Sequence, residues 1–246
     1  MNALVFAAGR GTRLRPYTND RPKALVEVGG VPMLERVILK LKAAGIKKVV
    51  VNVHHFAGKI VEFLESKENF GIDIAISDET DLLLETGGGI LKASKLLGEE
   101  PFIVHNADIL TDFPVEQIVN SHLRSRADVT LLVDNRKTSR YLFFDKNNRM
   151  SGWGNVAEEK YLPAGFVPDA SVRPLAFGGV HILDSSVLEP LARFATERNL
   201  DAFSIIPFYA DACRQIVING FTPDETYRWI DIGKPESLAE ANRLFE

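Results

Sequence analysis

The sequence is poor in cysteine and has no strong excess of charge of either sign. Cys213 is the only cysteine among 246 residues, so no disulfide can form within the chain, and we expect its thiol to be a small buried apolar group. The net charge of -4 gives no reason to expect binding to nucleic acid or to a membrane. A basic segment in this acidic chain is therefore a local feature that needs its own explanation.

Long hydrophobic runs and targeting signals are missing as well. The N-terminal segment MNALVFAAGR has no basic region, and its apolar run is too short for a signal peptide or a membrane span. We therefore expect a cytoplasmic protein, either a monomer or a homodimer. The chain is 46% hydrophobic and 25% charged, which is typical of a protein that buries a sizeable core.

The first half of the chain alternates predicted strands with predicted helices. Apolar runs predict strands over residues 4–7, 49–53, 102–104 and 129–133, and an alternating run predicts another over 72–76. Apolar residues at helical spacing predict helices over 33–44, 57–66, 88–97 and 115–123. This alternation predicts the α/β class, with an open, mostly parallel sheet covered by helices on both faces.

The second half is less regular. It predicts a hairpin over 141–145 and 150–153, a strand over 174–183, helices over 185–195 and 203–213, a strand over 227–233 and a last helix over 235–245. No repeat, low-complexity tract or linker is visible. We therefore predict one domain, residues 1–246, with a mixed sheet, a nucleotide-binding half of about 1–135 and a second half of about 136–246.

A basic loop punctuated by glycine follows the first predicted strand. It reads GRGTRLRPYTNDRPK and ends at Lys23. Ligands of open α/β sheets bind beyond the carboxyl ends of the strands, where this loop begins. Gly9 and Gly11 let the backbone approach a ligand closely, and Arg13 and Lys23 supply the charge that a polyphosphate requires. The loop therefore predicts a polyphosphate site, with Arg15 and Arg21 as solvated surface cations.

Two common phosphate-binding motifs do not fit this loop. A Walker motif requires Gly-Lys followed by Ser or Thr, and no such sequence follows a strand here. The dinucleotide fingerprint requires a third small residue, whereas this chain has Leu14 there.

The complete loop resembles the signature of the sugar-1-phosphate nucleotidyltransferases, G-x-G-T-R-L-x-P-x-T followed by P-K. The segments LETGGGI (84–90), VHNADILTDFP (104–114) and RWIDIGKPESL (228–238) are similar to the family's other site segments, so the resemblance covers nearly the whole chain. It is strongest to the N-acetylmuramate-1-phosphate uridylyltransferase branch, with mannose-1-phosphate guanylyltransferase-like proteins second. The chain departs from the family pattern at Ala24, Ala107 and Lys234, the last beside a proposed metal ligand.

The resemblance implies a fold and a reaction. The fold is a Rossmann-like three-layer α/β/α sandwich, that of the nucleotide-diphospho-sugar transferases. The reaction is Mg²⁺-dependent transfer of a nucleotidyl group from an NTP, with UTP favoured, to a sugar 1-phosphate. A GTP- or CTP-using relative, including one that loads phosphocholine, and a catalytically silent nucleotide-sensing subunit remain alternatives. We expect no C-terminal β-helix domain, because the sequence lacks its repeats.

The resemblance also implies roles for individual residues. Arg13 and Lys23 are the expected catalytic cations, and Asp108 and Asp231 the expected Mg²⁺ ligands. Both aspartates follow strand-like runs, although from spacing alone Asp108 could equally be a turn or helix cap. Glu79 is a candidate reader of the base. The expected nucleotide contacts are Ala8, Gly9, Arg10, Gly11, Thr12, Arg13, Lys23, Glu79, Gly87 and Gly88.

The sequence gives fewer indications of how the acceptor, the sugar 1-phosphate, is bound. Arg140, Asn155 and Gly179 are the candidates for contacts with the sugar or its phosphate, and a surface charge, a turn and a strand bulge explain them equally well. His54 and His55 are not expected to bind a metal, since neighbours on a strand point to opposite faces.

Overall fold

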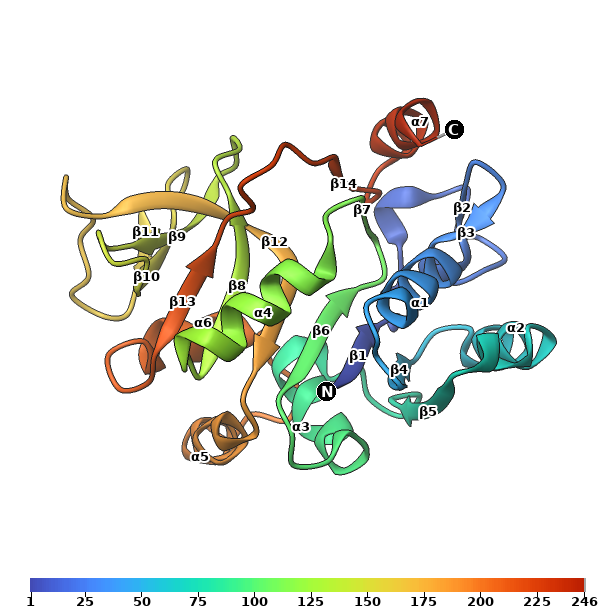
Figure 1. Cartoon of the computed structure of the whole chain (residues 1–246), viewed down its shortest axis with the longest axis horizontal. Coiled ribbons are helices and arrows are strands. Elements are labelled where there is room, and N and C mark those ends of the chain that lie inside the picture. The colour runs from blue at the N-terminus through green and yellow to red at the C-terminus, as the bar shows by residue number, and fades with distance from the viewer. Residues whose placement is uncertain (246) are drawn as a thin grey trace.

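The computed structural model describes residues 1–245, and its centre is a mixed sheet of ten strands (Figure 1). Their order is β11-β10-β9-β12-β6-β1-β4-β5, and β8 pairs with both β12 and β13. The strands are β1 (Asn2–Phe6), β4 (Lys48–Val53), β5 (Asp73–Asp78), β6 (Phe102–Asn106), β8 (Val129–Asp134), β9 (Arg140–Phe144), β10 (Met150–Asn155), β11 (Lys160–Leu162), β12 (Arg173–Leu183) and β13 (Ile218–Phe221).

The N-terminal part of this sheet is parallel. β1 lies between β4 and β6, with Ala3 opposite Val49 on one side and Ile103 on the other. These strands are continuous apolar runs because both of their faces are covered. β12 runs antiparallel to β6 and β8, which makes the sheet mixed. β12 belongs to the predicted second half yet lies beside two strands of the first, so the two halves share one sheet.

Helices cover both faces of the sheet and form three layers with it. Successive residues of β1 point to opposite faces, so Leu4 packs into one core cluster and Ala3 and Val5 into another. The first cluster includes side chains of α3 (Glu85–Leu97), α5 (Leu188–Glu197) and α6 (Ile205–Ala212). The second includes side chains of α1 (Met33–Ala43), α2 (Ala57–Ser66) and α4 (Val115–Ser125). This arrangement confirms the predicted three-layer α/β/α sandwich.

A separate two-stranded ribbon lies beside the sheet. β7 (Ile109–Thr111) pairs antiparallel with β14 (Trp229–Asp231). A third apolar cluster joins this ribbon to α7 (Pro235–Leu244) and to the small hairpin of β2 (Glu27–Val28) and β3 (Val31–Pro32). Figure 1 shows α7 beyond the end of the ribbon.

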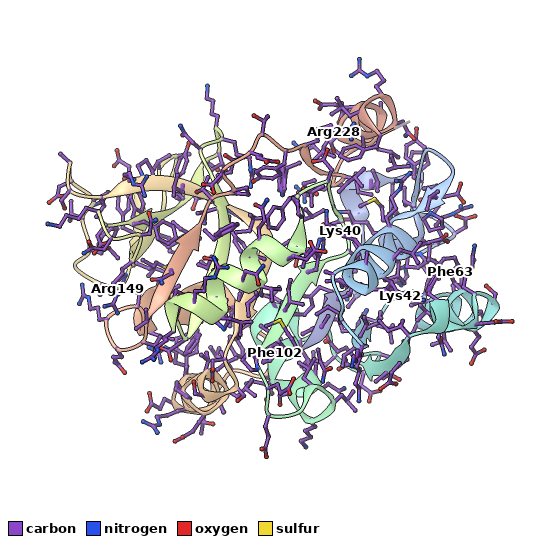
Figure 2. All side chains as sticks on the ribbon, viewed as in Figure 1. Lys40, Lys42, Phe63, Phe102, Arg149 and Arg228 are labelled. Atoms are coloured by element: carbon purple, nitrogen blue, oxygen red, sulfur yellow. The ribbon has the colours of Figure 1, made fainter. Side chains whose placement is uncertain are left out.

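Two cations brace the ribbon, and Figure 2 labels both. Lys40 on α1 donates a hydrogen bond from Nζ to the carbonyl of Thr111, 2.7 Å away. Burial lowers the pKa of Lys40 to about 8. Arg228 pairs with Asp112, with 2.7 Å between Nε and Oδ2, and its guanidinium stacks on Phe245. Contacts from α1 and the C-terminal segment therefore restrain β7 and β14.

Most predicted elements are present. The prediction missed five strands: β2 and β3, which form the short hairpin, and β7, β11 and β13. It also placed the start of α3 three residues late, at 88 rather than at Glu85. Among residues 1–245, no helix combines the length and apolar character that crossing a membrane requires.

Candidate active site

The loop after β1 folds back onto Lys23. Gly11 has a φ of +62°, which favours glycine, and a Cβ there would lie 2.8 Å from Cγ2 of Thr18 and 3.1 Å from Cβ of Lys23. The Thr18 hydroxyl donates to the Gly11 carbonyl over 2.8 Å. Gly11 therefore permits close packing within the loop. Gly9, in contrast, has no neighbouring atom within 4 Å of its Cβ position, so the space beside it is open.

Lys23 joins the two aspartates that the sequence predicts as metal ligands. Its Nζ lies 2.5 Å from Oδ2 of Asp108 and 3.6 Å from Oδ1 of Asp231. The Lys23 residue is only 8% exposed, so its charge requires anionic partners. The ribbon explains the arrangement, because the amide of Ile232 donates to the carbonyl of Asp108 over 3.0 Å. Both carboxylates thus emerge from the same end of β7 and β14.

Arg13 lies on the same side of the site as Asp231. A Cβ added at Gly233 would lie 3.0 Å from Oδ1 of Asp231 and 3.3 Å from Nη2 of Arg13. Arg13 is exposed, so its guanidinium can meet an incoming anion. Arg10 and Thr12 are exposed on the same loop, and so are the predicted surface cations Arg15 and Arg21.

The aspartate pair has the chemistry of a Mg²⁺ site. Oδ1 of Asp231 is buried and has no hydrogen-bond partner among the described residues, and 3.6 Å is too far for a hydrogen bond to Lys23. Mg²⁺ is usually held by one or two carboxylates, with phosphate oxygens and waters completing the shell. Residues 1–245 contain no group of three or more Asp, Glu, His or Cys side chains that could hold a metal. The pair therefore fits Mg²⁺ that is bound together with a phosphate ligand.

A cleft of about 360 Å³, here named the loop cleft, opens beside these groups. The backbone at Ala8 and Gly9 forms part of its wall, together with Lys23 and Asp108. Its far side is formed by Leu83, Glu85, Thr86 and Ser204. Glu85 has a φ of +57°, a strained conformation of the kind that often occurs at binding sites.

A buried hydrogen-bond network connects the two sides of the loop cleft. Oδ1 of Asn52 accepts from the amides of Ala7 (2.7 Å) and Ala8 (3.2 Å), and its Nδ2 donates to Oε1 of Glu79 (2.9 Å). Oε2 of Glu79 accepts from the amide of Leu84 over 3.0 Å. Glu79 is 0% exposed and does not line the cleft. Both carboxylate oxygens of Glu79 are used within the protein, and its expected contact with the base stays a prediction.

The glycines of LETGGGI also have a different setting from the expected one. Gly87 and Gly88 lie inside the first turns of α3 rather than before it, and neither lines the loop cleft. A Cβ at Gly87 would lie 2.3 Å from Cε2 of Phe203, and one at Gly88 would lie 2.5 Å from the carbonyl of Asp201. These glycines therefore permit close packing of the 201–203 segment against α3.

A second cleft of about 310 Å³, here named the arginine cleft, adjoins the first. Asn106 lines both clefts, and Asp231 lines the second. Arg136, Arg140, Phe177, Gly179 and Trp229 form other parts of its wall. The Lys23–aspartate cluster therefore lies at the junction of the two clefts.

Two of the three residues predicted to contact the sugar 1-phosphate line the arginine cleft, and the third does not. Arg140 and Gly179 line the arginine cleft. Gly179 has a φ of +75° and lies where the register between β12 and β8 shifts, so the predicted bulge is also present. Asn155 is 4% exposed, and its Oδ1 accepts from the amide of Ala157 over 3.2 Å. Asn155 therefore stabilises a turn and does not line either cleft, and its expected sugar contact stays a prediction.

His105 and His54 have different surroundings. Burial lowers the pKa of His105 to about 4, so this side chain is neutral at pH 7, and its Nδ1 lies 2.9 Å from the carbonyl of Asn106. His54 follows β4 instead of lying in it. β4 ends at Val53, so the alternation of neighbours on a strand does not apply to His54 and His55, and their lack of a metal role stays a prediction.

Three residues of the clefts have no prediction from the sequence. Asn52 is a polar residue in the otherwise apolar strand β4, which is a visible signal. Asn106 directly precedes Ala107 and the predicted metal ligand Asp108. Arg136 follows β8 in a polar segment and has no sequence feature that distinguishes it from a surface arginine.

The chain is similar to known enzymes over its full length. The sequence model of the nucleotidyl transferase family matches residues 2–246. An N-acetylmuramate alpha-1-phosphate uridylyltransferase of Caulobacter vibrioides is 35% identical over 99% of this chain and 97% of that protein. A probable mannose-1-phosphate guanylyltransferase of rice (Oryza sativa) is 30% identical over 100% of this chain and 64% of that protein. The fold is also similar to a crystal structure of a putative glucose-1-phosphate thymidylyltransferase from Bacillus anthracis. The match has a TM-score of 0.81 at 20% identity and covers 99% of this chain and 94% of the Bacillus chain, which supports the fold.

Proposed function

This chain belongs to the nucleotidyl transferase family, and we propose that it transfers the uridylyl group of UTP to N-acetylmuramate 1-phosphate. The products are the UDP-sugar and pyrophosphate. Similarity to the uridylyltransferase of Caulobacter vibrioides over 99% of the chain supports this choice of substrates. We expect the protein to act in the cytoplasm as a monomer or homodimer.

The observation that carries the proposal is the position of Lys23, Asp108 and Asp231. These charged groups lie where the loop cleft meets the arginine cleft. A reaction that joins a nucleoside triphosphate to a sugar phosphate requires two anionic ligands to meet at such a junction. In our proposal UTP occupies the loop cleft and the sugar phosphate occupies the arginine cleft.

The reaction requires no catalytic base. A phosphate oxygen of the acceptor is already ionised near neutral pH and attacks the α-phosphorus of UTP. A new O–P bond forms while the bond to the leaving pyrophosphate breaks. The chain's task is to hold two anions in line and to stabilise the charge that develops on the transferred group.

Two cations suit this task. Lys23 is held by the aspartates and can contact the reacting phosphates, while the exposed Arg13 can contact the leaving pyrophosphate. Asp108 and Asp231 would hold Mg²⁺, which neutralises phosphate charge when it is bound. Asn52 and Glu79 keep the loop at Ala8 and the segment at Leu84 in place on either side of UTP.

The test is pyrophosphate release by the purified protein with Mg²⁺. UTP, GTP, CTP and dTTP are each combined with N-acetylmuramate 1-phosphate, mannose 1-phosphate, glucose 1-phosphate and phosphocholine. We expect release with UTP and N-acetylmuramate 1-phosphate and a strongly reduced rate in Asp108→Asn. Release with GTP and mannose 1-phosphate would assign the second branch instead. Nucleotide binding without release from any pair would favour the silent, nucleotide-sensing alternative.

A further inference from the structure

Arg136 is a cation held firmly in the wall of the arginine cleft. Its guanidinium carbon lies 3.5 Å from the ring centroid of Trp229, and its Nη2 donates to the carbonyl of Phe177. The indole of Trp229 is itself fixed, because its Nε1 donates to the carbonyl of Gly178 over 2.8 Å. Arg136 is thus oriented by both its stacking and its hydrogen bond, unlike a free surface arginine.

No carboxylate of the described residues forms an ion pair with Arg136 within 4.0 Å. Its Nε is buried and has no hydrogen-bond partner there. An arginine stays protonated in proteins, so this partly buried charge has no carboxylate in direct contact, and Asp134 and Asp231 act on it only from beyond ion-pair distance. Burying a charge without a partner is unfavourable, and an anionic ligand in the cleft would relieve that cost.

The position of Arg136 separates it from the reacting phosphates. It stacks on Trp229, which lies two residues before Asp231 on β14. Residues two apart on a strand point to the same face and lie roughly 7 Å apart. Lys23 and the two aspartates mark the phosphate end of the site. Arg136 contacts Trp229 whereas Lys23 approaches Asp231, so the two cations lie at positions two residues apart along β14.

We propose that Arg136 recognises a carboxylate carried by the sugar ring of the acceptor and so makes the enzyme selective for an acidic sugar 1-phosphate. This inference rests on the proposed function and adds the residue that determines acceptor specificity. Arginine suits the role because its planar guanidinium forms strong, directional hydrogen bonds with carboxylates. The acceptor then carries two acidic groups, a phosphate bound near Lys23 and a carboxylate bound at Arg136.

The experiment compares two acceptors that differ only in the acidic group. N-acetylmuramate 1-phosphate has a lactyl ether with a carboxylate, whereas N-acetylglucosamine 1-phosphate has a hydroxyl at the same position. Steady-state pyrophosphate release is measured for wild type, Arg136→Met, Arg136→Lys and Lys137→Met. Methionine retains an apolar contact with Trp229, lysine retains the charge without the planar fork, and Lys137 is an exposed neighbouring cation that serves as the control.

We expect wild type to prefer the acidic acceptor and Arg136→Met to lose that preference. Its kcat/KM for the acidic acceptor should fall by about 10- to 100-fold, mainly through KM, because a hydrogen-bonded charge pair is lost. The value for the neutral acceptor should change by less than about 3-fold. Arg136→Lys should fall between wild type and Arg136→Met, and Lys137→Met should match wild type.

Two results would overturn the inference. Equal losses for both acceptors in Arg136→Met would show that Arg136 serves the shared phosphate or the fold. A wild-type enzyme that uses both acceptors equally well would show that no carboxylate is recognised. Either result leaves the proposed nucleotidyl transfer intact, whereas a lack of pyrophosphate release from every sugar 1-phosphate would reject the proposed function itself. Thermal melting of each variant shows whether it is folded.

Discussion

Lys23 and Asp108, which lie 85 positions apart in the sequence, form an ion pair with 2.5 Å between Nζ and Oδ2. The pair lies at the end of the β7–β14 ribbon, where Asp231 approaches the same lysine. Three charged groups from distant parts of the chain thus share one small volume. Changing one of them alters the charge balance of the others.

The first prediction concerns Asp108. We expect Asp108→Asn to lower kcat by about 100- to 1000-fold while the protein remains folded, because a neutral amide is a poor Mg²⁺ ligand and no longer forms an ion pair with Lys23. Pyrophosphate release and circular dichroism check the two parts. Asp169→Asn, at an exposed position far along the chain, is the control. Near wild-type turnover in Asp108→Asn would remove this carboxylate from the proposed centre.

The second prediction separates the two interpretations of Glu79. Glu79→Gln keeps the shape of the side chain but replaces one of its two acceptor oxygens, so one donor from Asn52 or Leu84 is left unpaired. We expect a loss of about 1–3 kcal/mol in unfolding free energy. KM should rise by a similar factor for every NTP that is used.

A change in base preference alone, with stability unchanged, would restore the base-reading role that the sequence predicted for Glu79. Asp81→Asn is the matched control, because Asp81 is an exposed carboxylate on the same segment. Urea unfolding and NTP kinetics on the two variants supply both readouts.

The third prediction concerns Gly87 in α3. We expect Gly87→Ala to destabilise the protein by about 1–3 kcal/mol, since the new methyl group would lie 2.3 Å from the ring of buried Phe203. Gly58→Ala in α2 is the control. It has nothing within 4 Å of its Cβ position and should stabilise the helix by less than about 1 kcal/mol. Equal thermal shifts for the two variants would contradict the packing explanation.

The fourth prediction concerns His181, which is 3% exposed and faces the hydroxyl of Tyr209. Burial lowers the pKa of His181 from 6.5 to about 3. The unfolded chain therefore takes up a proton below pH 6.5 that the folded protein does not, so unfolding becomes easier as the pH falls from 6.5 toward 3. We expect this group to lower the unfolding free energy by about 2 kcal/mol between pH 7 and pH 5.

The check is urea unfolding at pH 7 and pH 5. His181→Gln should show a smaller loss of stability between the two pH values than wild type. His55→Gln, at an exposed position, should show the same loss as wild type. An unchanged pH dependence in His181→Gln would mean that this side chain is not the source.

The sequence predicts the charged centre because the carboxyl ends of strands meet at one edge of an α/β sheet. Lys23, Asp108 and Asp231 each follow or end a recognisable segment, so their approach to one another was expected. The short strands β7 and β14 that hold the aspartates in register were only partly visible. Three residues are too few for a periodic pattern to identify a strand.

Other parts of the site depend on contacts that no local pattern reports. Glu79 was expected to face the base, but its burial follows from pairing with Asn52 on a neighbouring strand. The glycine at 87 signals a close approach, and the sequence does not say whether a ligand or the ring of Phe203 approaches. Arg136 resembles any surface arginine until Trp229, far along the chain, is found beneath it.

The ribbon of β7 and β14 has a consequence for the order in which the protein becomes active. Among residues 1–245 the two strands pair with each other and with no strand of the main sheet; Asp108 directly precedes β7, and Asp231 is the last residue of β14. A nascent chain can display the glycine loop and Lys23 early in its synthesis. It has no partner for β7 until β14 has left the ribosome. A chain terminated before that point holds Lys23 and Asp108 but lacks Asp231, so the charged centre is incomplete.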